Sequence, residues 1–415
     1  MSESLAIWII SLVSIAGVIL RPFRVKEAIW AVAGAGLLVV LQLISPGDAW
    51  AGITKGTDVY LFLFGMMLLA EVAREERLFD WLAAKAVVLA RGSAKRLFAL
   101  TYLVGIAVTG LLSNDATAVV LTPAVAAAMR AAKVAKPLPY LLICAFIANA
   151  ASFLLPISNP ANLVIYGTSI PSLLHWIPRY LGSSVLSIGV TYLLLYRTQR
   201  RDLQEPLEMA IDLPGLSSTG RSAAWGIGVT AVVLLASSAW NIPLGLPTAI
   251  TGFLTSAFVL VRAKKTPVQI IKGISWLVLP LVAGLFVIVE ALNKTGLIRV
   301  LSQLLRHAAT RDVVGATWGS GIGIALISNG MNNLPSGLIA ADAVQAAHVP
   351  EMVRSAVLIG VDLGPNLSVT GSLATILWLT ALRREGQSVS GWTFLKLGSI
   401  VMLPALVAAI AALWW

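Results

Sequence analysis

Long apolar segments separated by short clusters of basic residues are the feature that most constrains how this chain folds. The first two segments span residues 4–20 and 28–45, and Arg21, Arg24 and Lys26 lie between them. A helix needs about 17 to 25 mostly apolar residues to cross the hydrocarbon core of a bilayer. The charged fraction is 12%, about half of the ~25% that is typical of soluble domains. The sequence therefore predicts an all-α polytopic membrane protein.

Residues 111–123 interrupt this pattern, because a polar cluster falls inside an apolar run at membrane depth. The polar members of the cluster are Ser113, Asn114, Asp115 and Thr117. The apolar flanks, 97–112 and 118–129, are each short for a separate crossing. Non-helical backbone at that depth is tolerated only where it is buried in protein or lines a wet cavity. We therefore expect a re-entrant hairpin whose polar tip belongs to a solute site.

A similar cluster occurs in the second half of the chain, inside a predicted hairpin over residues 312–349. Its tip spans residues 328–335, and its polar members are Ser328, Asn329, Asn332 and Asn333. This tip has amides but no acid. Uncharged donors and acceptors suit a neutral, hydroxylated solute better than a carboxylate. The alternative is that these asparagines only hydrogen-bond between helices.

Two further apolar runs are broken at their middle. Residues 138–166 are interrupted at Pro156, Pro160 and two asparagines, Asn159 and Asn162, and residues 352–382 are interrupted at Gly364, Pro365 and Asn366. Proline removes a helical hydrogen bond, so each run predicts a membrane helix that is unwound in the middle. Freed backbone groups in such helices need partners or a ligand. The asparagines at these breaks are therefore further candidates for the solute site.

The same order of segments occurs twice, which indicates an internal repeat. Residues 1–200 contain three spans, an interfacial helix at 78–90, a hairpin, a broken helix and a last span; 201–222 form a linker; 223–415 repeat the plan. The remaining predicted segments are the third span at 58–72, an amphipathic piece at 168–180, a span at 181–196, spans at 223–240, 244–261 and 275–291, an amphipathic piece at 296–309 and a span at 396–413. The total is about ten transmembrane helices plus two re-entrant hairpins.

Lysine and arginine concentrate on one predicted side of the membrane. If residues 21–26 face the cytoplasm, that side holds 23 of the 30 basic residues and the other side holds 7. The positive-inside rule then places both termini outside and the central linker in the cytoplasm. The hairpins enter from opposite sides, so the two halves have inverted topology, as in many secondary transporters.

Asp115 and Asp362 are the acids that this scheme places at membrane depth near a tip or a break. Intramembrane acids are costly and usually mark pathways, so Asp115 is a candidate for proton coupling. The alternative for the Ser113 to Asp115 cluster is a plain helix N-cap. Asp362 is either a second proton group or a partner of the unwound backbone. Glu71 and Glu290 lie near helix ends, where pairing with nearby basic residues is expected.

Other chemistry has no sequence signal. The chain has one cysteine, Cys144, which excludes an intramolecular disulfide and a multi-thiolate metal site. It has no P-loop and no motif of serine hydrolases, zinc proteases or dithiol proteins. The basic residues lie between apolar segments rather than on a soluble face, so nucleic acid is not an expected partner. We expect no cofactor and no enzyme activity.

Three stretches resemble the arsenite efflux permeases of the ion transporter superfamily: residues 61–71, 113–117 and 328–335. The resemblance covers essentially the whole chain. The hairpin motif alone is also similar to that of sodium/proton antiporters and, with threonine for aspartate, of dicarboxylate carriers. The pair Asn332 and Asn333 favours the arsenite permeases.

The resemblance implies export of arsenite and antimonite as neutral hydroxides across the plasma membrane, in exchange for protons. It also implies a homodimer and, in some members, a cytoplasmic arsenite-stimulated ATPase as partner. The nearest alternative is a sodium/proton antiporter in which Asp115 binds the cation. A membrane-embedded enzyme and a passive channel are alternatives of other classes.

Overall fold

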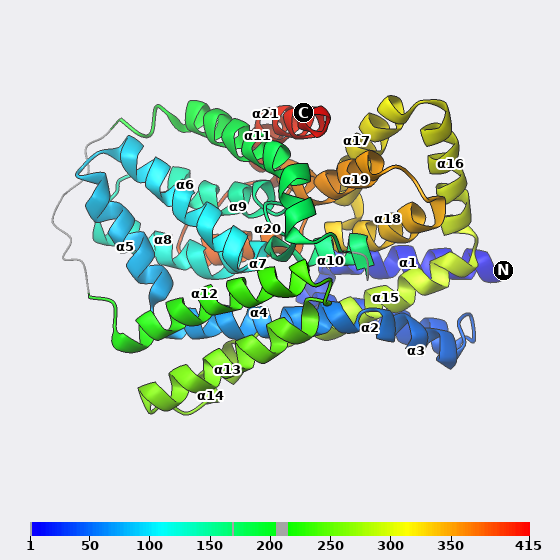
Figure 1. Ribbon diagram of the computed structural model, residues 1–415, viewed down its shortest axis with the longest axis horizontal. Helices are drawn as coiled ribbons and strands as arrows, with labels where there is room; N and C mark the ends of the chain where they lie inside the picture. The colour runs from blue at the N-terminus through cyan, green and yellow to red at the C-terminus, as the bar shows by residue number, and fades with distance from the viewer. Residues whose placement is uncertain (1, 168–169, 205–214) are drawn as a thin grey trace.

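The computed structural model describes residues 2–167, 170–204 and 215–415. All regular elements among these residues are helices (Figure 1). The first half contains α1 (Glu3–Leu20), η1 (Pro22–Arg24), α2 (Glu27–Val40), α3 (Pro46–Lys55), α4 (Thr57–Glu75), α5 (Leu78–Ala90), α6 (Ala94–Leu111), α7 (Asn114–Ala116), η2 (Thr117–Leu121), α8 (Thr122–Ala131), α9 (Leu138–Ala150), η3 (Pro156–Ser158), α10 (Pro160–Tyr166) and α11 (Leu173–Gln199).

The second half contains the corresponding elements in the same order. They are α12 (Ser218–Ala239), α13 (Gly245–Ala263), α14 (Val268–Gly273), α15 (Val278–Lys294), α16 (Leu297–Arg311), α17 (Val313–Met331), α18 (Asn333–Ala347), α19 (Glu351–Leu363), η5 (Gly364–Leu367), α20 (Leu373–Arg384), α21 (Gly391–Ala411) and η6 (Ala412–Trp414). Hairpin one is α6 to α8, and hairpin two is α17 with α18. The broken helices are α9–α10 and α19–α20.

Five helices of the described residues are long and apolar enough to span a membrane: α1, α6, α12, α13 and α21 extended by η6. Two bent pairs satisfy the same test together, α3 with α4 at 48° and α15 with α16 at 75°. Several other helices are shorter because they belong to hairpins or broken helices. Shorter helices at membrane depth need protein around their ends, since free backbone groups there have no water.

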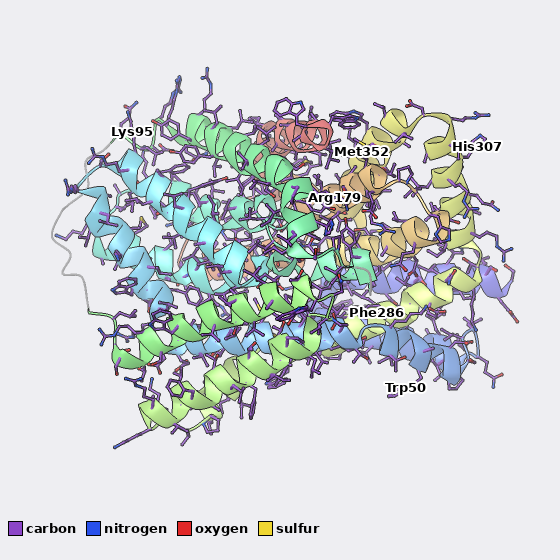
Figure 2. All side chains as sticks on the ribbon, in the orientation of Figure 1. Trp50, Lys95, Arg179, Phe286, His307 and Met352 are labelled. Carbon is purple, nitrogen blue, oxygen red and sulfur yellow. The ribbon has the colours of Figure 1, made fainter. Side chains whose placement is uncertain are left out.

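The two halves exchange equivalent contacts. Helix α4 of the first half packs against α13 of the second, and α15 of the second half packs against α2 of the first. In Figure 1 these helices run along the long axis, while α5 and α16 lie steeply across it at opposite ends. Figure 2 places Lys95 and His307 at these opposite ends as well. The steep helices at the two ends of the molecule therefore come from different halves of the chain.

Several predicted boundaries differ from the structure. The predicted C-terminal end of the span over 28–45 is wrong, because α2 ends at Val40 and a separate helix, α3, begins at Pro46. Ser45 caps α3 by accepting a 3.0 Å hydrogen bond from the Asp48 amide, and proline is preferred in the first turn. The pieces at 168–180 and 181–196 join in one continuous helix, α11. Pro178 is the sixth residue of this helix; it removes one backbone hydrogen bond, but the helix continues past it.

The predicted linker over 201–222 also ends earlier than expected, because α12 begins at Ser218. Ser217 caps this helix through a 2.8 Å hydrogen bond from the Gly220 amide. Residues 205–214 of the linker and 168–169 of the amphipathic piece lie outside the described residues. A helix over 78–90 is confirmed as α5, and the second break falls at Gly364 and Pro365 as predicted. The first break begins earlier than predicted, because α9 ends at Ala150, before Pro156.

Candidate functional site

The tip of hairpin one is built by local side-chain caps. Helix α6 ends at Leu111, and Ser113 takes an extended conformation before the chain turns back. The Ser113 hydroxyl accepts a 3.1 Å hydrogen bond from the Ala116 backbone amide, and the side-chain oxygen Oδ1 of Asn114 accepts a 2.9 Å bond from the Asp115 backbone amide. Ser113 therefore caps the returning helix, which is the alternative predicted for this cluster. This capping leaves the Asp115 carboxylate without a hydrogen bond or ion pair to the described residues.

The returning helix of hairpin one contains a π-helical turn, η2, directly after α7. Pro123, near the start of α8, has no backbone N–H for the regular helical bond, which favours the wider turn. The Thr122 hydroxyl instead donates a 3.4 Å bond to the Thr117 carbonyl. Single π-helical turns of this kind often occur at functional sites.

The tip of hairpin two has the same construction. The hydroxyls of Thr109 and Thr117 lie 2.8 Å apart across hairpin one, and those of Ser328 and Ser336 lie 2.9 Å apart across hairpin two. At the second tip Asn332 has φ 72° and accepts a 3.3 Å bond from the Leu334 amide. Each pair spans eight residues, so each hydroxyl pair fixes the register of its hairpin.

The two broken helices cross and bond to each other. The Asn159 amide nitrogen donates a 2.8 Å bond to Oδ1 of Asp362. The Asn149 amide nitrogen donates a 3.0 Å bond to Oδ1 of Asn366, whose own amide donates to the Phe146 carbonyl at 2.8 Å. All of these side chains are buried. The crossing therefore joins the two halves through amides and one carboxyl group.

Other predicted site residues hold the breaks in place. The Asn162 amide donates a 2.9 Å bond to the Ser152 carbonyl, which the unwound segment leaves without a helical partner. The Asn329 amide donates to the Gly364 carbonyl at 3.0 Å and thereby ties hairpin two to the second break. Asn329 also accepts a 2.7 Å bond from the Ser368 hydroxyl. These bonds satisfy backbone groups that would be costly to leave unpaired.

A small cavity of about 20 Å³ lies where both tips and both breaks meet. That volume is close to the space of one water molecule. Its lining residues come from hairpin one, the first break, α4, α15, hairpin two and the second break: Asn114, Asp115, Asn159, Pro160, Leu63, Val278, Val282, Asn333, Leu334, Ser372, Leu373 and Ala374. The site is thus closed tightly around its polar groups.

A second cavity of about 80 Å³ adjoins the first and shares Leu63, Asp115, Pro160 and Val278 with it. It extends toward Glu71 at the end of α4 and Gly273 at the end of α14, and Ser113 lies on its wall. Glu71 is paired there with Arg74, whose Nε donates a 2.9 Å bond. The shared carboxylate of Asp115 therefore faces both the small cavity and a passage toward one end of the molecule.

A larger cavity of about 420 Å³ lies elsewhere, between α1, α16 and hairpin two. Its walls are mostly apolar and include Leu12, Leu297, Leu301 and Leu305, and none of its lining residues is charged. A solute site needs a few convergent polar groups. The small cavity between the tips meets that requirement, and the large apolar one does not.

The structure brings together four of the predicted residues around the small cavity: Asn114, Asp115, Asn159 and Asn333. Ser113 lies on the adjoining passage. Thr117, Asn162, Ser328, Asn329, Asn332, Asn366 and Asp362 lie behind this lining and bond to protein groups. Sequence reasoning missed Ser372 on the lining and Asn149 at the crossing. A polar residue inside the apolar run 138–155 was the available signal for Asn149.

Cys144 is fully buried in α9 and lines neither of the two polar cavities. Among the described residues there is no group of three or more histidine, cysteine, aspartate or glutamate side chains that could hold a metal ion. Glu71 pairs with Arg74, which lies within one turn, as expected. Glu290 also forms an ion pair, but with Lys55 at 2.6 Å rather than with the neighbouring Lys294, which pairs with Asp48.

Apolar spanning helices, two hairpins whose tips meet, and two crossed broken helices define a multi-pass membrane transport protein. Residues 6–361 match the family model described as citrate transporter. The chain belongs to this family.

Curated relatives of similar length carry a more specific description. The chain is 28% identical over 393 residues to an arsenical pump membrane protein of Yersinia enterocolitica, with 91% of each chain covered. It is 28% identical over 397 residues to the arsenical pump membrane protein of Escherichia coli K12, with 92% of each chain covered. An uncharacterized transporter of Mycobacterium tuberculosis is 26% identical over 96% of this chain and 95% of its own.

Among solved structures, the fold is similar to that of the YdaH transporter of Alcanivorax borkumensis. The TM-score is 0.60 at 16% sequence identity, and the match covers 88% of this chain and 86% of the other. The likeness confirms the predicted fold class, an all-α polytopic membrane protein.

Proposed function

We propose that this protein exports arsenite and antimonite as neutral hydroxides in exchange for protons. The observation that carries the proposal is the small cavity between the two hairpin tips, whose polar lining consists of amides, one hydroxyl and one carboxylate. These groups can donate to and accept from the three hydroxyls of a trivalent hydroxide. The names of the arsenical pump relatives support the same class of substrate.

Within this proposal, Asn114, Asn159, Asn333 and Ser372 contact the solute directly. Thr117, Ser328, Asn329, Asn332, Asn162 and Asn366 position the tips and breaks through the hydrogen bonds described above. Ser113 caps the returning helix beside the passage. Because the cavity is now about the size of one water molecule, the solute must enter by movement of a tip or a break.

Asp115 and Asp362 are the proposed proton-coupling groups. Asp115 reaches both the site and the passage, and no described residue neutralises it. Asp362 is fully buried, with an amide donor on one oxygen. A neutral solute carries no charge, so a carboxyl that is charged in one state and neutral in another has to provide the coupling to the proton gradient.

Two alternative substrates, citrate and sodium, carry a charge, whereas the hydroxide of trivalent arsenic is neutral. Citrate, the substrate in the family description, is a multivalent anion, and the lining of the small cavity contains no lysine or arginine. A sodium/proton antiporter is favoured by one observation, the unpaired Asp115 carboxylate beside Asn114. In that mechanism Asp115 would bind the cation directly.

The proposal includes a plasma-membrane location with both termini outside and the central linker in the cytoplasm, as the charge distribution predicts. It also includes assembly as a homodimer and docking of a cytoplasmic arsenite-stimulated ATPase.

The deciding experiment compares arsenite and sodium uptake into inside-out vesicles with an acidic interior. Arsenite uptake that collapses when a protonophore is added supports the proposal. Proton-coupled sodium uptake without arsenite uptake contradicts it and supports the antiporter.

A further inference from the structure

Asn149 and Asp362 occupy equivalent positions in the two halves. Helices α9 and α19 are both 13 residues long, and each of these residues is the last but one in its helix. An unwound segment follows each helix, and a polar cap, Asn159 or Ser372, then begins the second part of the broken helix. The positions are therefore matched by local structure as well as by order along the chain.

Each of the two residues bonds to the broken helix of the other half. Asp362 accepts the amide of Asn159, 203 residues earlier in the chain. Asn149 donates at 3.0 Å to Asn366 and at 3.3 Å to Thr375, more than 200 residues later. The pair thus forms a reciprocal crossing at the centre of the molecule.

Both residues have a relative exposure of 0% and leave one oxygen unpaired, Oδ1 of Asn149 and Oδ2 of Asp362. An unpaired buried polar atom costs about 1–3 kcal/mol, so a well-packed crossing with no other role would not be expected to retain two. The difference between the positions is chemical. A carboxyl group can take up and release one proton, whereas an amide cannot.

We propose that positions 149 and 362 are two equivalent sites of one buried crossing, and that the acid at 362 opposite the amide at 149 limits this crossing to one exchangeable proton per transport cycle. Asn149 is then a positioning residue, which holds Asn366 and Thr375 at the second break while Asp362 changes its proton. This inference rests on the proposed proton exchange and extends it from the presence of coupling to its stoichiometry.

The test moves the acid between the two positions. The variants are Asp362→Asn, Asn149→Asp and the double variant with both changes, each checked for monodispersity after purification. Arsenite accumulation at equilibrium is measured in vesicles with a pH difference of about one unit and no membrane potential. For a neutral solute, each coupled proton then changes the accumulation ratio about tenfold, because a tenfold ratio corresponds to about 1.4 kcal/mol.

We expect Asp362→Asn to lower the accumulation ratio about tenfold, Asn149→Asp to raise it about tenfold and the double variant to restore the wild-type ratio. A double variant that stays at the Asp362→Asn level, or a ratio that is unchanged in Asn149→Asp, overturns the equivalence. Absence of proton-dependent arsenite accumulation in the wild type would instead refute the proposed function.

A further variant covers the case in which Asn149→Asp does not fold. Asn149→Thr replaces the amide donor with a hydroxyl donor and introduces no acid, so we expect slower turnover at the wild-type accumulation ratio. A changed ratio in Asn149→Thr would show that the ratio depends on the packing of the crossing rather than on its number of acids, and it would overturn the proposal.

Discussion

Gly65 of α4 and Gly252 of α13 pack backbone to backbone, where the first half meets the second. A Cβ atom on Gly252 would lie 2.5 Å from the carbonyl oxygen of Gly65, and one on Gly65 would lie 2.2 Å from the carbonyl oxygen of Thr248. Small residues at such crossings let membrane helices approach closely enough for van der Waals contact to hold them together. This contact joins the two halves, and Leu63 of the same helix α4 lines the small cavity.

The substitution Gly252→Ala should destabilise this contact. The new methyl group meets backbone, which cannot rotate away, so α4 and α13 must separate at a cost of about 1–3 kcal/mol. The measurement is the thermal unfolding midpoint in detergent. Gly228→Ala in α12 is the matched control, because a Cβ there meets no atom within 4 Å; alanine should be neutral or stabilising by up to about 1 kcal/mol. Equal midpoints for the two variants would contradict close packing at Gly252.

The substitution Asp115→Asn should separate binding from coupling. The amide preserves the size of the side chain and its ability to hydrogen-bond, but it cannot release a proton. We expect arsenite binding to purified protein to persist while proton-driven accumulation in vesicles falls about tenfold at a pH difference of about one unit, because the proton of Asp362 stays coupled. Accumulation at the wild-type level would make Asp115 a structural residue and leave Asp362 as the only coupling carboxylate of the two. Loss of arsenite binding, together with proton-coupled sodium flux in the wild type, would favour the antiporter.

The substitution Cys144→Ser should leave arsenite efflux intact. Trivalent arsenic is a soft metalloid, so a sulfur ligand would be a reasonable guess, but Cys144 is fully buried and lines neither polar cavity. The assay is arsenite resistance of cells together with uptake into vesicles. Loss of transport at normal membrane expression would refute a site made of oxygen and amide groups.

Cysteines placed at Lys95 and at His307 should be reached from opposite sides of the membrane. These residues lie at opposite ends of the molecule (Figure 2), and the charge distribution places Lys95 in the cytoplasm. In a Cys144→Ser background, a membrane-impermeant thiol reagent added to intact cells should label Lys95→Cys weakly and His307→Cys strongly. The reverse pattern would invert the predicted topology.

The sequence by itself determined the class of fold and the approximate positions of the hairpins and breaks, although α9 ends at Ala150, before Pro156. These features depend on local properties: the length of an apolar run, the missing N–H of Pro156 or Pro365, and polar residues where hydrocarbon surrounds the chain. Helix α5 therefore begins and ends where it was predicted. The early end of α2 could also have been predicted, because Ser45 followed by Pro46 is typical of a helix start.

Only the tertiary structure decided which polar residues meet. Asn159 and Asp362 are 203 positions apart, and Asn149 and Asn366 are 217 apart, so no local pattern relates them. The same asparagine type faces the cavity at Asn333 and ties down the backbone at Asn329. The physical reason is that a side-chain amide can form hydrogen bonds equally well with a solute or with a backbone carbonyl group. The crossing of the two halves, set by the packing of α4 on α13 and of α15 on α2, determines which of these partners lies within reach.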